Sequence, residues 1–375
     1  AAAGSDVKCA DPFKAAGIPF QYFRMDRGWN PINDARTYLS LARVIKKLKP
    51  DLVHAFATKP AVWGRLAARR ASSPVIVGTL PGLGSLYSFN DMLTRVIRTT
   101  YEPLQRRACY GSDLTIFQNQ SDLNHFVDRS LSPELRSVII PGSGVRTDRL
   151  DPKKADPEAA RAFRRELDAD ERNVVVTMIA RVIRSKGVRE FAEAARILRE
   201  SHPNIRFALV GPEDKESWDS LTPSEFDEVK ESVRWLGRRS DVRSVYAGSD
   251  VFVLPSYREG MPRVLLEAAS MELPLVAARN PGCEAVVDHQ INGFLVEPQD
   301  ASGLASKIRE LAVQPLLRKR FARASREIAV RRFDLTVVAE MTARHYQRLL
   351  TEAGVLAGVQ PAQEVRDRAM DAALA

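Results

Sequence analysis

The chain has 375 residues, enough for two domains or one large one. Apolar residues make up 45% and charged residues 27%, which excludes a disordered chain, a collagen-like chain and a small disulfide scaffold. The three cysteines (Cys9, Cys109 and Cys283) form no CxxC pair, so we expect a reduced compartment with neither a zinc nor a disulfide framework. No apolar run approaches about 18 residues and the opening AAAGSDVKCA lacks a signal-peptide pattern, which predicts a cytoplasmic protein without a transmembrane helix.

The basic excess lies entirely in the first part of the chain. Residues 1–150 hold 21 Lys and Arg against 12 Asp and Glu, whereas residues 151–375 hold 35 of each. Such an asymmetry indicates a polyanionic partner for the first part, although a solvated basic surface explains it equally well. Nucleic acid is disfavoured because the basic residues are not interleaved with aromatic ones and no recognition motif is present.

Alternating short apolar runs and helical patterns predict βαβ units with a parallel sheet in the first part. The expected strands are Asp6–Ala10, Asp51–Phe56, Pro74–Gly78 and Asp113–Phe117. The expected helices start at Asn33 or Asp34 and end near Lys49, then cover Ala61–Arg70 and Asp91–Arg107. The last of these is amphipathic and basic, with Arg95, Arg98, Arg106 and Arg107, so it either lies on an anionic membrane or packs on its own sheet.

The second part repeats the pattern. We expect strands at Val174–Ile179, Ile205–Val210, Val233–Leu236, Asp250–Leu254 and Pro274–Ala277. We expect helices at Val188–Glu200, Met261–Met271, Ala301–Leu311, Pro315–Val330 and Leu335–Leu350. Turn residues concentrate at 141–154, which places one domain at 1–150, a second at 151–350 and a tail at 351–375. Two doubly wound sheets put ligands at the carboxyl ends of their strands, so the loops after strands are the places to search for chemistry.

The segment from Ser256 to Glu267 is the strongest functional signal. A strand ends there, a loop with glycine and proline turns, and a helix begins, which presents free backbone N–H groups to an anion or a sugar oxygen. Glu259 in the loop and Glu267 on the helix can each accept two hydroxyl hydrogen bonds. The alternative is that Glu259 only complements the helix dipole and Glu267 is a surface charge.

Other strand ends supply cations and turn glycines. Arg181 and Lys186 lie between a strand and a helix, where two cations can neutralise a diphosphate leaving group, with Arg184 as a further candidate. A solvated turn explains them too. Gly211 and the pair Leu236–Gly237 end two strands at points where backbone could approach a base or a phosphate.

In the first part, His54, Thr58 and Lys59 lie at the end of one strand and Gly82 and Gly84 in the loop after the next. A single histidine is more often structural than catalytic, but we retain His54 as a catalytic candidate and the other four as candidates for the acceptor side.

These motifs resemble glycosyltransferase family 4. The resemblance rests on Glu259-x7-Glu267 after DVFVLPSYREGMP, on Arg181 and Lys186, and on VGP and WLGRRSDV in the family's order. The segments DLVHAFATKPAVWGRLAAR, PGLG, IFQNQSD and PGSGV resemble the branch that acts on lipid-linked oligosaccharides. The resemblance covers residues 4–350.

The resemblance implies a GT-B fold, with two Rossmann-like α/β domains facing a cleft and a last helix, Leu335–Leu350, that crosses back to the first domain. It also implies a retaining, metal-independent transfer from a nucleotide sugar, with no cofactor. Glu267 would bind the ribose, Glu259 the hexose, and Arg181 and Lys186 the diphosphate. The donor side would further include Gly260, Met261, Pro262, Val264 and Gly211, with Leu236 and Gly237 at the base.

Three features depart from the family's pattern. Arg146 follows Gly144-Val145 where the family has Asp, and the donor loop reads EGMP instead of EGFG. The segment Ala1–Gly4 looks like the end of the first helix, so the first βα unit would be missing from this chain. Expression with and without the upstream codons tests that expectation through stability and activity.

The sequence therefore predicts a transferase that moves a hexose or N-acetylhexosamine from a nucleotide sugar, with a UDP-sugar as the expected donor, to a polyprenyl-diphosphate-linked acceptor. The partners would be the nucleotide sugar, a lipid-linked or glycan acceptor, and the anionic inner face of the cell membrane through the basic first domain. The alternatives are another GT-B enzyme, such as a nucleotide-sugar epimerase or a phosphorylase, and a non-catalytic nucleotide-binding protein.

Overall fold

The computed structural model describes residues 2–4, 10–25, 30–83 and 92–356. The chain forms two compact units: unit 1 comprises residues 1–140 and 341–375, and unit 2 comprises residues 141–340. Residues 141–150, expected in the first domain, belong to unit 2, because the backbone of Val145 is hydrogen-bonded to that of Phe333 and Leu335. Helix α14 (Leu335–Glu352) begins in unit 2 and ends in unit 1, as expected for the last helix.

Unit 1 contains a four-stranded parallel sheet of order β3-β4-β5-β6. Its strands are β3 (Leu52–Phe56), β4 (Val75–Leu80), β5 (Leu114–Phe117) and β6 (Ser137–Ile139). Its helices are α2 (Pro31–Leu48), α3 (Thr58–Arg70), α4 (Met92–Tyr110) and α5 (Gln120–Asp128). Helix α2 starts earlier than expected, because Asn30 caps it by accepting the N–H groups of Ile32 and Asn33.

The start of unit 1 differs from the expectation. Ala2–Gly4 forms strand β1, which pairs in parallel with β2 (Phe20–Tyr22), and is therefore not the end of a helix. A Cβ on Gly4 would lie 2.9 Å from the ring of Phe20, so the small residue fits this packing. Helix α1 (Ala10–Ala15) begins at Ala10, where a strand was expected to end; the rest of that expected strand lies outside the described residues.

Unit 2 contains a six-stranded parallel sheet of order β12-β11-β10-β7-β8-β9. The strands are β7 (Val174–Ile179), β8 (Ile205–Val210), β9 (Arg234–Trp235), β10 (Val251–Leu254), β11 (Leu275–Ala278) and β12 (Gly293–Val296). Strands β7 and β8 have the expected bounds. The chain builds outward from β7 through β8 to β9, then returns beside β7 and builds the other way from β10, so the strand order reverses between β7 and β10.

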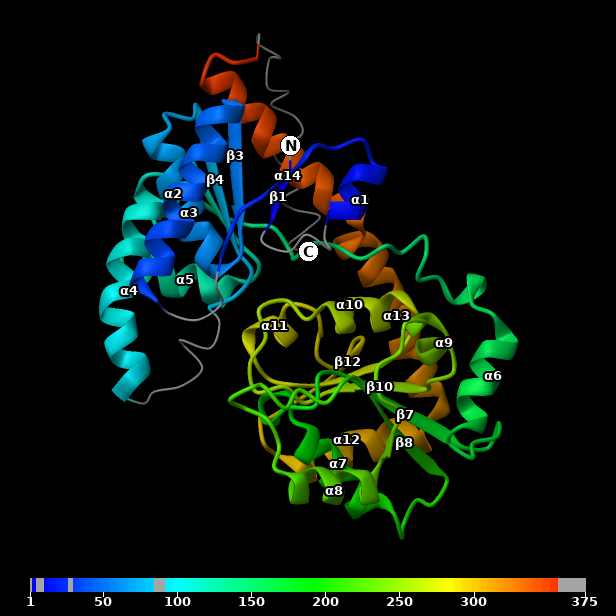
Figure 1. The fold of residues 1–375 in the computed structure, drawn as a ribbon. Helices are drawn as coiled ribbons and strands as arrows, with labels where there is room; N and C mark the ends of the chain where they lie inside the picture. The colour runs from blue at the N-terminus through cyan, green and yellow to red at the C-terminus, as the bar shows by residue number, and fades with distance from the viewer. Residues whose placement is uncertain (1, 5–9, 26–29, 84–91, 357–375) are drawn as a thin grey trace. The chain divides into compact units, whose positions relative to one another are not determined.

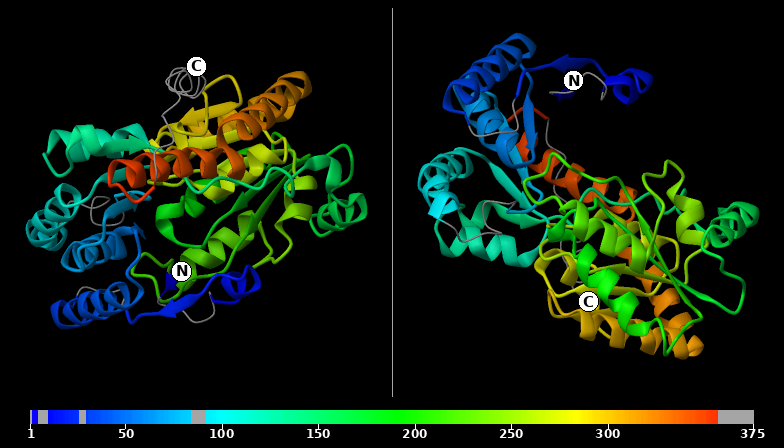
Figure 2. Two further views of the ribbon diagram at one scale, coloured as in Figure 1. Left: turned by 90° about the horizontal axis from the view of Figure 1, so that it is seen from above. Right: turned by 60° about the horizontal axis from the view of Figure 1, so that its bottom comes forward.

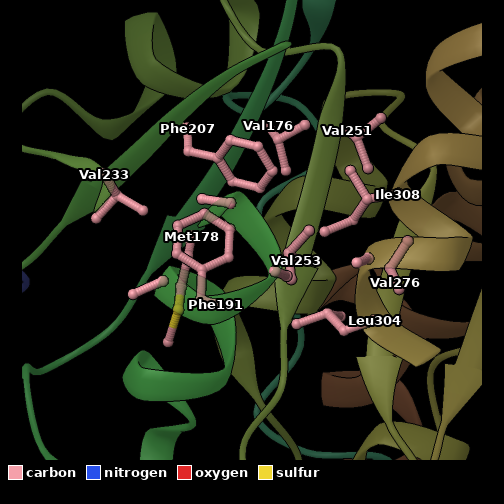
Figure 3. Close-up of a cluster of buried hydrophobic side chains, with 14 of the residues drawn as sticks. Val176, Met178, Phe191, Phe207, Val233, Val251, Val253, Val276, Leu304 and Ile308 are labelled. Atoms are coloured by element: carbon pink, nitrogen blue, oxygen red, sulfur yellow. The ribbon is translucent and has the colours of Figure 1, made fainter. Parts of the chain in front are cut away.

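Helices cover both faces of this sheet (Figures 1 and 2). They are α6 (Pro157–Arg165), α7 (Val188–Leu198), α8 (Pro223–Ser232), α9 (Val242–Ala247), α10 (Arg263–Ser270), α11 (Pro281–Glu284), α12 (Ala301–Val313) and α13 (Pro315–Phe333). On one face, Met178 and Val253 of the strands pack with Phe191 of α7 and Ile308 of α12 (Figure 3). On the other, Phe252 and Leu275 pack against α10 and α13. Both faces are apolar because a parallel sheet is buried on both sides.

Candidate active site

The strand order of unit 2 reverses between β7 and β10, and the residues singled out in the sequence follow these two strands. In open parallel sheets, ligands bind outside the carboxyl ends of the strands at this point, because the two loops there turn away from each other. The β7 loop carries Arg181 and Lys186, and the β10 loop carries Glu259. The sequence and the topology therefore place the candidate site at the same edge of the sheet.

Lys186 and Glu259 form an ion pair across this edge. The Lys186 Nζ atom lies 2.5 Å from Glu259 Oε1, and the two side chains are 23% and 13% exposed. The two loops also touch through their backbones, since Tyr257 donates its N–H to the Ser185 carbonyl at 2.9 Å. Gly187, at φ 75°, allows this approach, because a Cβ there would lie 2.2 Å from the Pro255 carbonyl oxygen.

The loop after β11 supports the β10 loop from behind. Buried Asn280 caps α11 with its side-chain oxygen and donates its side-chain N–H to the Ser256 carbonyl at 2.8 Å. A Cβ on Gly282 would lie 2.6 Å from the backbone of Glu259, so this glycine packs directly beneath that residue. Sequence reasoning missed both contacts, although the turn pattern Asn-Pro-Gly after a buried strand marks such a cap.

Glu267 is held by two residues of unit 2. Its side chain, 14% exposed, accepts from the Tyr246 hydroxyl at 3.0 Å on Oε2 and from Arg263 Nε at 2.9 Å on Oε1. Tyr246 is fully buried, and burial together with the Glu267 charge raises its pKa well above the usual value. The phenol therefore stays protonated and donates, which fixes the carboxylate. Tyr246 was not among the candidates from the sequence.

The three cations of the β7 loop have different partners. Lys186 meets Glu259, whereas the exposed Arg181 pairs with Asp214 at 2.6 Å. Arg184 binds Glu225 with two hydrogen bonds, of 3.1 and 2.5 Å. The hydrogen bond from Arg184, helped by Thr222, lowers the pKa of Glu225 to about 2. Arg184 therefore anchors the loop that carries the other two cations.

The ends of β8 and β9 are arranged differently from each other. Gly211 donates its N–H to Gly237 at 2.8 Å and accepts from Trp235 Nε1 at 2.9 Å, and a Cβ there would lie 1.7 Å from the Ala180 carbonyl oxygen. Gly211 therefore uses its N–H and one lone pair of its carbonyl oxygen inside unit 2, and its contact with a ligand stays a prediction. Gly237, at φ 64°, has open space around it. Leu236 is half-buried and donates its backbone N–H to the Leu209 carbonyl at 2.9 Å.

The remaining donor-side candidates cluster around the start of α10. Pro262 is buried and directly precedes the helix, and Gly260, Met261 and Val264 are half-buried. A Cβ on Gly142 would lie 2.8 Å from Met261 Cγ, so the PGSG segment supports the donor loop within unit 2. Arg146, which stands where the family has Asp, pairs with Asp148 at 2.8 Å on the surface.

His54 occupies a structural position in unit 1. One ring nitrogen, Nε2, lies 2.7 Å from Thr79 Oγ1, and the other is hydrogen-bonded to the Tyr346 hydroxyl. Burial, followed by the positive charge of Arg65, lowers the pKa of His54 to about 4. Since both nitrogens are engaged, the geometry favours the structural interpretation over the catalytic one.

The acceptor-side candidates of unit 1 do not form one cluster in the described residues. Lys59 is buried and pairs with Asp34 at 2.6 Å, which ties α3 to α2. Thr58 is the first residue of α3 and is half-buried. Gly82 adopts φ 149° in the loop after β4, and Gly84 lies outside the described residues.

No cluster of three or more His, Cys, Asp or Glu side chains in the described part of the chain could hold a metal ion. Cys109 and Cys283 are both buried as free thiols, and Cys9 lies outside the described residues. Nor does the structure contain, in the residues that it describes, a helix both long and apolar enough to cross a membrane.

Known families match both parts of the chain. The model "Glycosyl transferases group 1" matches residues 160–328, and "Glycosyl transferase 4-like" matches residues 4–119. The chain is 30% identical over 273 residues to the UDP-Gal:alpha-D-GlcNAc-diphosphoundecaprenol alpha-1,3-galactosyltransferase of Escherichia coli. The aligned region covers 72% of this chain and 68% of that protein. It is 29% identical over 321 residues (86% and 83%) to the N,N'-diacetylbacillosaminyl-diphospho-undecaprenol alpha-1,3-N-acetylgalactosaminyltransferase of Campylobacter jejuni.

Solved structures agree on the fold. HepE of Anabaena in complex with UDP superposes with a TM-score of 0.75 at 21% identity and covers 92% of this chain and 90% of that one. The two parallel α/β sheets confirm the expected GT-B class. The chain belongs to the group 1 glycosyltransferases of family 4, and it is a hexosyltransferase of polysaccharide biosynthesis.

Proposed function

We propose that this glycosyltransferase moves a hexose or an N-acetylhexosamine from a UDP-sugar to a sugar linked to a polyprenyl diphosphate. The product would enter an exopolysaccharide, O-antigen or capsule-type polymer. Support comes from the diphosphoundecaprenol acceptors in the names of the E. coli and C. jejuni relatives and from the UDP and UDP-glucose in the HepE structures. The observation that carries the proposal is the Lys186–Glu259 pair at the point where the strand order reverses.

Glu267 is proposed to bind the ribose. Each of its oxygens accepts one hydrogen bond from unit 2, from Tyr246 and from Arg263. A carboxylate oxygen has a second lone pair, so Glu267 can still accept one ribose hydroxyl on each oxygen. The base would then lie near Leu236 and Gly237, where Gly237 leaves open space.

The diphosphate and the sugar are assigned to the two loops of the ion pair. Lys186 and Arg181 would bind the diphosphate, because cations stabilise the charge that develops on a leaving phosphate. Glu259 would accept hydroxyl groups of the hexose, and the backbone of Gly260, Met261 and Pro262 would contact the same sugar. Val264 completes the donor side.

The transfer is proposed to retain the configuration at the anomeric carbon. The bond from this carbon to the UDP oxygen breaks while the bond to the acceptor hydroxyl oxygen forms on the same face. The acceptor proton passes to the leaving phosphate oxygen, so no protein nucleophile is required. Full activity after exhaustive chelation would support the proposed metal independence, and loss restored by Mg²⁺ or Mn²⁺ would contradict it.

Membrane attachment is proposed to be peripheral, at the inner face of the cell membrane, through unit 1. Helix α4 buries Tyr101 against unit 1 and exposes Met92, Val96, Arg95 and Arg106. Such a surface attracts anionic lipids, and the attraction is screened over about 10 Å at 0.1 M salt. Retention on anionic vesicles at high salt would contradict it. The acceptor side is assigned to unit 1, with Thr58 and Gly82 as candidates.

Thermal unfolding with a panel of nucleoside diphosphates tests the donor site. A ligand at 100 times its Kd adds about 2.7 kcal/mol to the free energy of unfolding, which shifts Tm measurably. We expect UDP to raise Tm, Glu267→Ala to abolish the shift, and Glu228→Ala, an exposed glutamate on α8, to preserve it. An equal UDP shift in Glu267→Ala would remove Glu267 from the donor site.

Product analysis tests the reaction. With a UDP-sugar and a polyprenyl-diphosphate-linked sugar, we expect free UDP and an extended lipid-linked glycan. An epimerised sugar formed without acceptor would identify an epimerase, and tight UDP binding without turnover would identify a nucleotide-binding protein instead.

A further inference from the structure

Helix α13 of unit 2 carries seven basic residues that divide into two groups. Three of them hold unit 2 together: Arg318 donates to the Leu311 and Ala312 carbonyls, Arg326 to Ser270 and its neighbours, and Arg332 to Asp288. On the same inward side, Phe321, Ser325, Ile328, Ala329 and Phe333 are buried. The inward side of α13 therefore accounts for these three cations.

The other four basic residues lie on a separate surface together with Leu316, Glu327 and Val330. We call this surface the α13 stripe; it comprises Leu316, Lys319, Arg320, Arg323, Glu327, Val330 and Arg331. At about 100° per residue, these seven positions fall within an arc of about 120° opposite the buried side. Within the described residues, none of its four cations takes part in an ion pair, and Glu327 is its one acid. Helix α13, drawn in orange, runs along the outer edge of unit 2 in both views of Figure 2.

Apolar side chains are part of the stripe. Leu316 at the start of α13 is 83% exposed, Val330 is 42% exposed, and Val313 at the end of the preceding helix is 56% exposed. Arg320 lies over the Phe321 ring, 5.3 Å from its centroid, but no ion pair within the described residues neutralises any of the four cations. A long, exposed leucine beside such cations is more than solubility requires.

We propose that the α13 stripe binds an anionic phospholipid surface, as a second membrane contact on unit 2. Arginine matches lipid phosphates with two parallel hydrogen bonds, and cations together with exposed leucine and valine are typical of interfacial helices. Nucleic acid fits less well, since the stripe has no aromatic side chain on which bases could stack. The proposal depends on neither the sugar nor the acceptor of the proposed function.

The net charge of the second part of the chain explains why the sequence shows no sign of the α13 stripe. Residues 151–375 are neutral as a whole, because the acids that balance these cations lie on other elements of the fold. Each cation at an anionic membrane strengthens binding by about five-fold. Four cations on one exposed helix face therefore suffice for a salt-sensitive attachment.

Vesicle co-sedimentation of the whole protein tests the proposal. The vesicles contain phosphatidylcholine alone or with about one-third phosphatidylglycerol, at about 0.1 M salt. The variant K319Q/R320Q/R323Q/R331Q should bind the anionic vesicles at least about ten-fold more weakly than the native protein, with an unchanged Tm. Glu327→Lys, which adds a cation to the centre of the stripe, should bind them several-fold more tightly.

A matched control removes the same charge elsewhere on unit 2. The control sites are exposed and lie on other elements: Arg149, Lys153, Arg234 and Arg243. The fold-loss of vesicle affinity in R149Q/K153Q/R234Q/R243Q should be less than about a third of the fold-loss in the α13 variant. Equal losses in the two quadruple variants, or native binding by the α13 variant, would overturn the proposal. So would a variant that binds vesicles normally but no longer binds soluble polyphosphate, since the stripe would then serve a different polyanion.

The α4 surface of unit 1 provides the comparison that separates this inference from the proposed function. If R95Q/R106Q loses vesicle binding while the α13 variant binds as the native protein does, the result would support the proposed unit 1 contact and refute the unit 2 contact. If only the α13 variant loses vesicle binding, the result would support the unit 2 contact and refute the unit 1 contact.

Discussion

Lys186 and Glu259 lie 73 residues apart in the sequence, yet Lys186 Nζ is 2.5 Å from Glu259 Oε1. Each side chain is the counterion of the other, while the proposed function assigns them to different parts of one donor. A diphosphate that binds Lys186 must therefore compete with the Glu259 carboxylate. In the proposed complex with a whole UDP-sugar, the hexose hydroxyl groups would give Glu259 new partners.

Glu259→Gln should bind UDP more tightly and turn over UDP-sugar more slowly. The competing charge is gone, so UDP should gain up to about ten-fold in affinity, or about 1.4 kcal/mol. The hexose loses a charged acceptor, which should lower kcat/KM by at least about 100-fold. Calorimetric titration with UDP and a UDP-release assay measure the two effects.

A matched control for this variant is Glu193→Gln, which also removes one glutamate charge from an ion pair, with Arg196 on α7. It should change neither UDP affinity nor turnover. Weaker UDP binding by Glu259→Gln, at a native Tm, would show that the carboxylate does not compete with the diphosphate.

Tyr246→Phe should weaken binding of the UDP-sugar donor and leave binding of the acceptor unchanged. The hydroxyl of Tyr246 donates to Glu267 Oε2 at 3.0 Å and is fully buried, so Tyr246 acts as a positioning residue for the carboxylate. A hydrogen bond to a charged group contributes about 1.5–3 kcal/mol; part of this should appear as a donor KM raised about three- to ten-fold. Tyr257→Phe, which loses a 2.8 Å bond to Glu190, is the control. If both variants raise the donor KM equally, the role of Tyr246 is only structural.

The sequence predicted the strands of unit 2 well, because β-branched runs such as Val174–Ile179 are long and have clear ends. It missed β12, a strand of only four residues that begins at Gly293 directly after a turn. It also missed α8, although Thr222 and Glu225 form a capping box that is visible in the sequence. The segment Ala2–Gly4 was assigned wrongly to the end of a helix because the family's pattern places the first helix there, whereas these residues pair with β2.

For the candidate site, the strand-end argument brought Lys186 and Glu259 together correctly. It could not distinguish Gly211 from Gly237, because a glycine at a strand end serves either a ligand or the packing of two backbones. It could not find Tyr246 either, since a buried tyrosine in a short helix has no local signature of a bond to Glu267. Such contacts depend on side-chain positions that only the tertiary fold defines.

Gly187→Ala and Gly237→Ala should differ sharply in stability. Both glycines have positive φ, of 75° and 64°, so both variants lose about 1–2 kcal/mol from backbone strain. Only at Gly187 does the added Cβ meet a neighbour, the Pro255 carbonyl oxygen at 2.2 Å. We therefore expect Gly187→Ala to cost at least about 2 kcal/mol more in urea unfolding. Equal losses would mean that the β7 and β10 loops can separate without penalty.

His54 should make unfolding depend on pH below neutrality. Burial lowers its pKa in the folded protein from 6.5 to about 4, so the unfolded chain takes up the proton first as the pH falls. The free energy of unfolding should therefore decrease between pH 6.5 and 4, by up to about 3 kcal/mol. Urea unfolding of His54→Gln should show a smaller decrease over this range.

The same variant decides between the two interpretations of His54. Loss of a general base costs about 10²–10⁴-fold in rate, whereas a histidine held by Thr79 and Tyr346 should cost stability but little catalysis. At neutral pH we expect His54→Gln to keep kcat within about ten-fold of the native value, measured below its own Tm. A loss of about 100-fold or more, with a native circular dichroism spectrum, would restore the catalytic assignment. The hydrogen bond to Tyr346 would then act by orienting the ring.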